Sequence, residues 1–164
     1  MPSSILRYER LDSPIGELLL TGDGATLSGL FMSPFRKAPE EWPDAKRDPG
    51  AFAEARRQLE AYFAGELRDF DLPLAFAGTD FQRRVWNELL RIPFGTTITY
   101  QQLATRVGNP KASRAVGLAN GRNPIAVIAP CHRVIGSDGS LTGYGGGLDR
   151  KRWLLAHERG GTLL

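Results

Sequence analysis

The chain's only cysteine lies in the run Pro130-Cys131-His132-Arg133-Val134. A single thiol forms no disulfide within the chain and cannot by itself build a cysteine-rich metal site. The chemistry left to it is nucleophilic attack by the thiolate, a form that a neighbouring imidazole or guanidinium favours. The alternative is a small buried side chain without chemistry, which is what most isolated cysteines are.

The surroundings of the cysteine favour the nucleophile. In a strand, neighbouring side chains point to opposite faces, so Cys131 and His132 meet only if the chain turns at Pro130 or if a water bridges them. The segment that follows is dense in glycine, and such a loop lets backbone approach a ligand closely. Its glycines are Gly136, Gly139, Gly143, Gly145, Gly146 and Gly147.

The elements around the cysteine are expected to be mostly helical. Thr79 begins a helix whose apolar stripe comprises Phe81, Val85, Trp86, Leu89 and Leu90. Two short helices are predicted next, one that starts over 99–104 and stops at 107–110 and one over 111–120. The turn between them contains glycine, which is the helix-turn-helix pattern. The basic start of the second helix favours contact with DNA. The apolar run 125–129 is predicted to be a buried strand, and 150–158 a final helix.

The N-terminal half has the pattern of a small antiparallel sheet with one helix. Strands are predicted over 4–11, 16–21 and 26–32, with turns at 12–14 and 22–24. A surface loop over 33–50, a helix over 51–64 and an extended linker over 66–76 follow. The expected fold is therefore an α/β domain, residues 1–78, followed by a mostly α domain with a helix-turn-helix, residues 79–164.

Composition and charge narrow the classes of protein. The chain has 164 residues, with 41% hydrophobic and 24% charged, which is typical of a soluble globular protein. It contains no apolar run near the roughly 18 residues that a membrane span needs, and its start does not resemble a secretory signal. We therefore expect a cytoplasmic protein that does not bind membranes. Residues 1–78 hold 9 basic and 13 acidic residues, whereas residues 79–164 hold 12 and 5, so the half with the cysteine suits a polyanionic partner.

The run from Pro130 to Val134 resembles the active-site signature of the O6-alkylguanine-DNA alkyltransferases. Further segments match that family in order and spacing: Thr99-Tyr100-Gln101-Gln102-Leu103-Ala104, Arg114-Ala115-Val116-Gly117, Asn123-Pro124, Gly143-Tyr144-Gly145-Gly146-Gly147 and Trp153-Leu154-Leu155-Ala156-His157-Glu158. The resemblance covers nearly all of residues 79–164. In the N-terminal half it rests chiefly on 12–16 and 62–65, and that half resembles the family's small ribonuclease-H-like domain.

The resemblance implies a DNA repair protein that reverses damage directly. Cys131 would take the alkyl group from O6 of a guanine irreversibly, once per molecule, as a suicide methyltransferase. His132 would act through a water as the base, Glu158 would orient the imidazole, and Asn123 would hold the turn around the cysteine. The family pattern gives His157 only a structural role. Activity on O4-alkylthymine is implied less directly, and the range of alkyl groups stays open.

The same resemblance assigns residues to the damaged base. The Tyr100 hydroxyl would lie near N3, and the backbone N–H of Gly145 would donate to O6. The backbone carbonyls of Cys131 and Val134 would accept from the exocyclic amine. Tyr144, in the glycine-dense segment, belongs to the same implied binding set.

The implied partner is double-stranded DNA, bound in the minor groove without sequence preference. Arg114 would fill the space that the extruded nucleotide leaves. The small residues Ala112 and Ser113 would let the helix approach the groove. Arg122 would also contact DNA, although some members have this arginine and the preceding glycine in reverse order. We expect a monomer in solution, and leave cooperative binding along DNA open.

No cofactor and no metal are expected. Family members with a zinc site use cysteines and histidines of the N-terminal domain, and this chain has neither before Cys131.

Three other functions remain to be distinguished. A damage-recognition module would bind and flip the base without transfer, but relatives of that type lack the cysteine. A cysteine hydrolase would turn over repeatedly on an acyl or peptide substrate. A regulator that senses its own alkylation would need a further domain.

Overall fold

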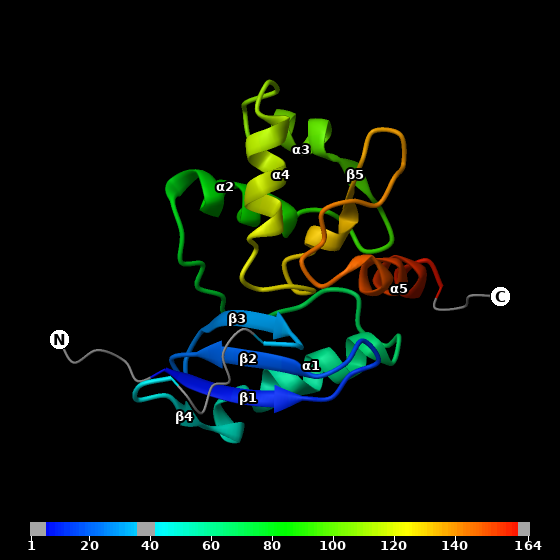
Figure 1. Cartoon of the computed structure of the whole chain (residues 1–164). Coiled ribbons are helices and arrows are strands. Elements are labelled where there is room, and N and C mark those ends of the chain that lie inside the picture. The colour runs from blue at the N-terminus through cyan, green and yellow to red at the C-terminus, as the bar shows by residue number, and fades with distance from the viewer. Residues whose placement is uncertain (1–5, 36–41, 161–164) are drawn as a thin grey trace. The chain divides into compact units, whose positions relative to one another are not determined.

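The computed structural model of the chain describes residues 6–35 and 42–160 (Figure 1). These residues form two compact units, the first ending at Ala75 and the second beginning at Phe76. The first unit is a small sheet with one helix, and the second is mostly helical. The fold class expected from the sequence is confirmed.

The sheet of the first unit has the strand order β3-β2-β1-β4. Strands β1 (Arg7–Leu11), β2 (Leu18–Gly22) and β3 (Leu27–Met32) are antiparallel neighbours, as predicted. Asp23 shapes the turn between β2 and β3, because its Oδ1 accepts hydrogen bonds from the backbone N–H groups of Ala25, at 2.8 Å, and Thr26, at 2.7 Å.

The fourth strand corrects the predicted loop over 33–50. Strand β4 (Lys46–Arg47) pairs in parallel with β1, so the sheet is mixed. With two exposed residues it lacks the alternation that identifies a strand in a sequence. Residues 36–41 of that loop, and 4–5 of the first predicted strand, lie outside the described residues.

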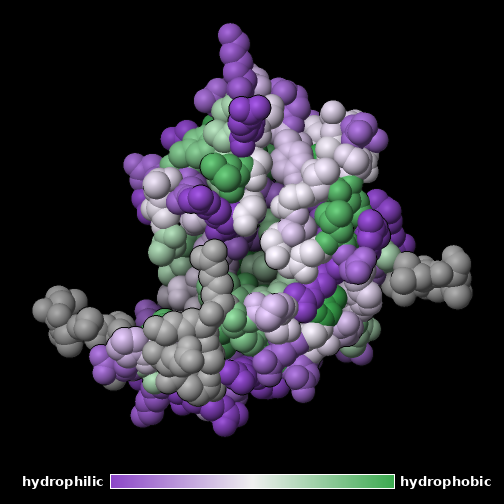
Figure 2. Space-filling model, in the orientation of Figure 1, coloured by the Kyte–Doolittle hydropathy of each residue, from purple (hydrophilic) through white to green (hydrophobic). Residues whose placement is uncertain are grey.

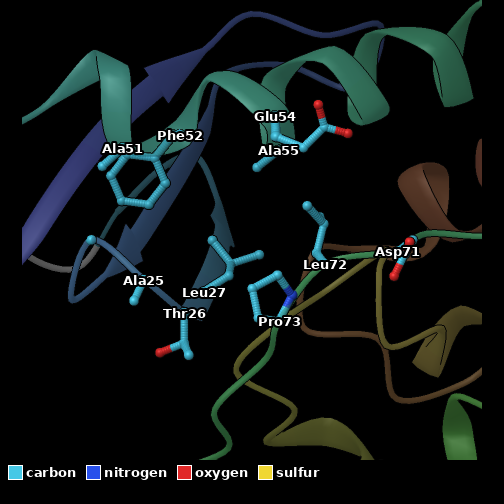
Figure 3. Close-up of a pocket in the computed structure, with 11 residues that line it drawn as sticks. Ala25, Thr26, Leu27, Ala51, Phe52, Glu54, Ala55, Asp71, Leu72 and Pro73 are labelled. Carbon is cyan, nitrogen blue, oxygen red and sulfur yellow. The ribbon is translucent and has the colours of Figure 1, made fainter.

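Helix α1 (Ala53–Phe63) follows a short 3₁₀ helix, η2 (Pro49–Phe52). Its fully buried Leu59 and Tyr62 belong to the core, in agreement with the predicted helical stripe. In the segment after α1, Leu74 forms an isolated parallel β-bridge with Leu27, in agreement with the predicted extended segment. Gln58 exchanges two hydrogen bonds with the Asp71 backbone, at 2.8 and 2.9 Å. Residues of the β2–β3 turn, of the end of η2, of the start of α1 and of 71–73 line a largely apolar pocket (Figure 3).

The second unit contains helices α2 (Asp80–Leu89), α3 (Tyr100–Arg106), α4 (Ser113–Gly121) and α5 (Leu148–Glu158). Thr79 and Thr99 cap α2 and α3, each paired with a glutamine three residues later that caps in return. The predicted helix-turn-helix is confirmed as α3 and α4.

A small strand pair in this unit was not predicted. Strands β5 (Ile98–Thr99) and β6 (Val134–Ile135) are parallel, and a 3₁₀ helix, η3 (Cys131–Arg133), precedes β6. The predicted strand over 125–129 is wrong, since these residues form turns in which Val127 has φ +70°. The run is nevertheless buried. Burial without alternation does not distinguish a strand from a turn enclosed by other elements.

The core of the second unit encloses the cysteine. Trp86, on α2, donates from Nε1 to the carbonyl of Ala119, on α4, at 2.8 Å and so fixes the two helices together. The apolar cluster includes Val85, Trp86, Leu89, Leu103, Val116, Cys131 and Val134. The face of the molecule in Figure 2 is mostly hydrophilic, with apolar residues scattered over it. None of the helices described here has the length and apolar character needed to cross a membrane.

Candidate active site

Cys131 begins the 3₁₀ helix η3, directly after Pro130, and its side chain is buried. The chain therefore turns at the proline, which is the condition under which Cys131 and His132 can lie on the same side. The preceding turn is held by Asn123, whose Nδ2 donates to the Ala129 carbonyl at 2.7 Å and whose Oδ1 accepts from the Ile125 N–H at 3.0 Å. Asn123 thus holds the turn from which the cysteine projects.

His132 and Glu158 form a buried pair across the unit. Nε2 of His132 lies 2.8 Å from Oε2 of Glu158, at the end of α5, and both side chains are almost fully enclosed. Among the residues that the structure describes, His132 Nδ1 has no hydrogen-bond partner. Since Nε2 faces a carboxylate, it carries the proton, and Nδ1 is left as an acceptor.

Arg133 also binds Glu158 rather than the thiol. Its Nε lies 2.8 Å from Oε1 and its second terminal nitrogen 2.9 Å from Oε2, while the first donates to the Ile92 carbonyl at 2.6 Å. Burial would raise the pKa of Glu158, but the hydrogen bonds from His132 and Arg133 outweigh it and hold the pKa well below its usual range. The carboxylate is therefore charged, and the Arg133 guanidinium stabilises its negative charge.

The thiol and the imidazole are both neutral in this arrangement. Burial raises the pKa of the Cys131 thiol, although a hydrogen bond from Asn123 and the charge of Lys151 act in the opposite direction. Burial also lowers the pKa of His132, against the opposing effect of Glu158. A neutral thiol beside a neutral imidazole needs a proton transfer before it can act as a nucleophile.

Lys151, on α5, ties the glycine-dense loop to the strand that follows the cysteine. Its fully buried side chain donates from Nζ to the carbonyls of Val134, at 2.7 Å, and Thr142, at 3.0 Å. The Tyr100 hydroxyl donates to the same Thr142 carbonyl at 3.0 Å, and Lys151 Nζ lies 6.0 Å from the centre of the Tyr100 ring. Tyr100 and Val134, two of the predicted base-binding residues, thus meet at Lys151.

The glycine-dense loop lies against Tyr100 and the end of α4. A Cβ on Gly143 would lie 3.5 Å from the Tyr100 hydroxyl, and one on Gly145 would lie 3.8 Å from the Gly121 carbonyl. Gly143 has φ +63°, a conformation that a residue with a side chain rarely adopts. Tyr144 is half-buried against the core around Cys131. The loop therefore brings Tyr144 and Gly145 to the same part of the unit as Tyr100.

The predicted DNA-binding residues lie on α4 and at its ends. Arg114, in the first turn, and Arg122, just after the last turn, are exposed. Ala112 is half-buried and packs against the core, and Ser113 donates from Oγ to Gln101 Oε1, on α3, at 3.0 Å. The helix thus presents two exposed cations, while its small first residues lie close to α3.

The sequence did not predict the contacts that three residues make in the site: Arg133 with Glu158, Lys151 with the Val134 carbonyl, and Asn120 with the Cys131 carbonyl. The signal for Lys151 was available, because it precedes Glu158 by seven residues and so shares its face of α5. The sequence predicts that the guanidinium of Arg133 favours the thiolate, whereas in the structure it binds Glu158. The third is Asn120, which donates from Nδ2 to the Cys131 carbonyl at 3.3 Å. The helical period places Asn120 on the same face as Val116, but it does not show that the amide reaches the Cys131 carbonyl.

Within the described ranges, no group of three or more histidine, cysteine, aspartate or glutamate side chains could hold a metal ion.

Comparison with known proteins identifies relatives of both units. The profile of the 6-O-methylguanine DNA methyltransferase ribonuclease-like domain matches residues 6–76, and that of the DNA-binding domain of the same proteins matches residues 80–160. A methylated-DNA–protein-cysteine methyltransferase of Mycobacterium tuberculosis H37Rv is 54% identical over 157 residues, covering 94% of this chain and 93% of that relative. One of Methanosarcina acetivorans is 56% identical over 154 residues, covering 92% and 97%. The crystal structure of M. tuberculosis OGT in complex with DNA superposes with a TM-score of 0.88 at 54% identity, over 95% of this chain and 94% of that one.

Proposed function

Because the chain belongs to the family of 6-O-methylguanine DNA methyltransferases, we propose that Cys131 is the residue that accepts the alkyl group from O6 of guanine in duplex DNA. The protein is a methylated-DNA–protein-cysteine methyltransferase that acts in DNA repair. The observation that supports this assignment of Cys131 is its position beside a buried His132–Glu158 pair whose Nδ1 is an available acceptor.

The proposed transfer begins with the proton of the thiol. It passes through a water to Nδ1 of His132, and the resulting imidazolium is stabilised by the Glu158 carboxylate, 2.8 Å away. The thiolate attacks the alkyl carbon, the new S–C bond forms as the C–O6 bond breaks, and the bonding electrons leave with guanine. The product is a thioether, which is stable to water, so each molecule reacts once.

The leaving guanine carries negative charge that the loop and Tyr100 would compensate. The Tyr100 hydroxyl would give its hydrogen bond to N3 in place of the Thr142 carbonyl that it contacts here, and the Gly145 N–H would donate to O6. The Cys131 and Val134 carbonyls would accept from the exocyclic amine in addition to their present donors, Asn120 and Lys151. Tyr144 would complete the pocket from the same loop.

DNA binding is assigned to α4, docked in the minor groove. This groove carries little sequence information, which suits a repair protein that must act anywhere. Arg114 is exposed in the first turn, where its side chain can occupy the space of an extruded nucleotide. Ala112 and Ser113 are small enough for close approach, and the exposed Arg122 would contact phosphate.

The remaining features of the proposal follow from the chemistry. A nucleophilic thiol without a disulfide partner in the chain suits a reducing compartment, and we place the protein in the cytoplasm. One molecule carries every proposed site residue, so a monomer is sufficient. A cysteine hydrolase is disfavoured because the thioether proposed as the product on Cys131 would prevent repeated turnover. A module that only binds damaged DNA is disfavoured because relatives of that type lack the cysteine.

The test is a transfer experiment with a duplex containing one O6-methylguanine. The intact protein is expected to gain the mass of one methylene, since a methyl replaces the thiol proton, and the gain should map to the Cys131 peptide. Substoichiometric protein should repair no more duplex than there are protein molecules. Cys131→Ala should bind the duplex with unchanged affinity and show no mass gain. Mass gain on another peptide, or repeated turnover, would overturn the proposal.

A further inference from the structure

Asn120 lies on the inner face of α4 and is 2% exposed. Its Nδ2 donates to the backbone carbonyl of Cys131 at 3.3 Å. Among the described residues, its Oδ1 has no hydrogen-bond partner. The buried amide therefore has a hydrogen-bond partner for its nitrogen and none for its oxygen.

The unpaired Oδ1 indicates that the useful group of this side chain is its Nδ2 donor. Buried polar atoms without partners are uncommon, because each is removed from water without compensation. A leucine has the same branching and the same number of side-chain heavy atoms, and it would leave no acceptor unpaired. Reversing the amide would place Oδ1 against the Cys131 carbonyl, so the observed orientation is fixed. What Asn120 supplies that leucine cannot is the donor to Cys131.

The carbonyl that receives this donor belongs to the peptide between Cys131 and His132. The same oxygen also accepts from the Val134 N–H inside η3. One donor comes from the turn itself and the other from α4, so this carbonyl is held from two separate elements. Fixing this peptide fixes the two Cα–Cβ directions on either side of it, and hence the placement of the thiol relative to the imidazole.

We propose that Asn120 is a positioning residue for alkyl transfer: through the Cys131 carbonyl, it holds the thiol and the imidazole in the relative orientation that proton transfer requires. This inference rests on the proposed function of Cys131 and His132. Because Asn120 is buried on the inner face of α4, we expect it to act through the Cys131 carbonyl and not by touching the damaged base or DNA. It thereby joins the helix proposed to dock on DNA to the proposed nucleophile.

The test compares Asn120→Leu with the wild-type protein and with Asn87→Leu. Asn87 is exposed on α2, where its amide donates to the Arg83 carbonyl at 2.9 Å, so it controls for loss of a helix asparagine. Rapid-mixing measurements separate the dissociation constant for methylated duplex from the first-order rate of transfer. In Asn120→Leu the rate is expected to fall about 10- to 100-fold, as for other small misplacements of reacting groups, with the dissociation constant and melting temperature retained. The same loss is expected with the free base O6-methylguanine.

The pH profile distinguishes positioning from support of the fold. In Asn120→Leu the thiol is no longer aligned with His132 and must lose its proton to solvent. More of the thiol ionises as the pH is raised toward about 9.5, so the transfer rate of the variant should approach that of the wild type. The other charged groups near the thiol, on Lys151, Arg133 and Glu158, are the same in both proteins. Asn120→Ala, which also lacks the donor, should show the same change with pH even if it is less stable.

A wild-type transfer rate in Asn120→Leu would overturn the inference, as would a deficit that is equal at every pH. Failure of the wild-type protein itself to gain a methyl group would instead reject the proposed function.

Discussion

Glu158 connects two cationic or potentially cationic side chains at the residue scale. Its carboxylate accepts from His132 and, through both oxygens, from Arg133. The arginine neutralises the carboxylate while the imidazole is neutral, and the carboxylate stabilises the imidazole once it gains a proton. The carboxylate at the end of α5, where it opposes the helix dipole, is thus stabilised by the buried cation of Arg133 and by the hydrogen bond from His132.

Replacing Glu158 by glutamine should separate these effects. Glu158→Gln keeps the shape but removes the charge that stabilises the imidazolium, so alkyl transfer should fall about 10²-fold or more, within the usual contribution of general-base catalysis. Quenched-flow transfer from methylated duplex measures this rate. Glu88→Gln, on α2, removes an acid that lies 3.8 Å from Arg91 and is the matched control. An unchanged rate in Glu158→Gln would contradict a role for the carboxylate in the proton transfer.

The same variant should change how stability depends on pH. The pKa of Glu158 in the folded protein lies below its ordinary value of 4.5, so the unfolded chain binds this proton more readily. The stabilisation is therefore complete above about pH 4.5 and is lost as the pH falls toward the folded pKa. Urea unfolding of the wild type should show this loss below pH 4.5, and Glu158→Gln should lose less over the same range. Equal slopes would contradict the lowered pKa.

At this scale the sequence predicted the pairing of His132 with Glu158, which the structure shows as a hydrogen bond of 2.8 Å. The roles of Cys131, His132 and Glu158 in the reaction stay predictions. Lys151 and Asn120 were not foreseen, since their importance depends on which backbone carbonyls they reach. A sequence does not show a side chain's distance from a carbonyl in another element.

Helix α4 has two distinct faces at the element scale. Val116, Ala119 and Asn120 are buried toward the core, whereas Arg114 is exposed. This division follows from the helical period, which is why the helix could be predicted. The turn over 125–129 could not, because its conformation depends on hydrogen bonds from Asn123 that periodicity does not show.

Arg114→Ala should separate extrusion from chemistry. If Arg114 occupies the space that the nucleotide leaves, its loss should slow repair of duplex DNA, while reaction with the free base O6-methylguanine should be unchanged. Extrusion costs a few kcal/mol, so losing its support should slow duplex repair about 10-fold or more. Arg84→Ala, which removes an exposed arginine from α2, is the control for general loss of charge. Equal losses on both substrates would contradict this role.

The distribution of charge is a property of the whole molecule. Residues 1–78 have four more acidic than basic residues, whereas residues 79–164 have seven more basic than acidic ones. The sequence predicted this division and the fold class, because both depend on composition and on long periodic segments. It missed β4, β5 and β6, each of two residues, because strands so short are defined by their partners.

The affinity for duplex DNA should fall steeply as salt is added. The slope of log affinity against log salt should be roughly 0.9 per phosphate neutralised, because bound cations are released. Fluorescence anisotropy with undamaged duplex between 50 and about 200 mM salt measures this slope, a range over which such contacts are weakened strongly. Arg122→Gln should lower the slope by about one phosphate contact. A flat salt dependence would exclude phosphate binding as the main source of affinity.

The backbone conformation of Val127 should remove the usual stability advantage of alanine over glycine at this position. It is fully buried with φ +70°, where a β-branched residue is strained by about 1–3 kcal/mol. Val127→Ala loses packing and keeps part of that strain, whereas Val127→Gly loses slightly more packing and relieves it. The free energies of unfolding of the two variants should therefore be equal or favour glycine, although at the helical Val116 glycine should cost about 1 kcal/mol more than alanine. The turn that leads to Cys131 thus keeps a strained backbone at Val127 together with the packing of its isopropyl group.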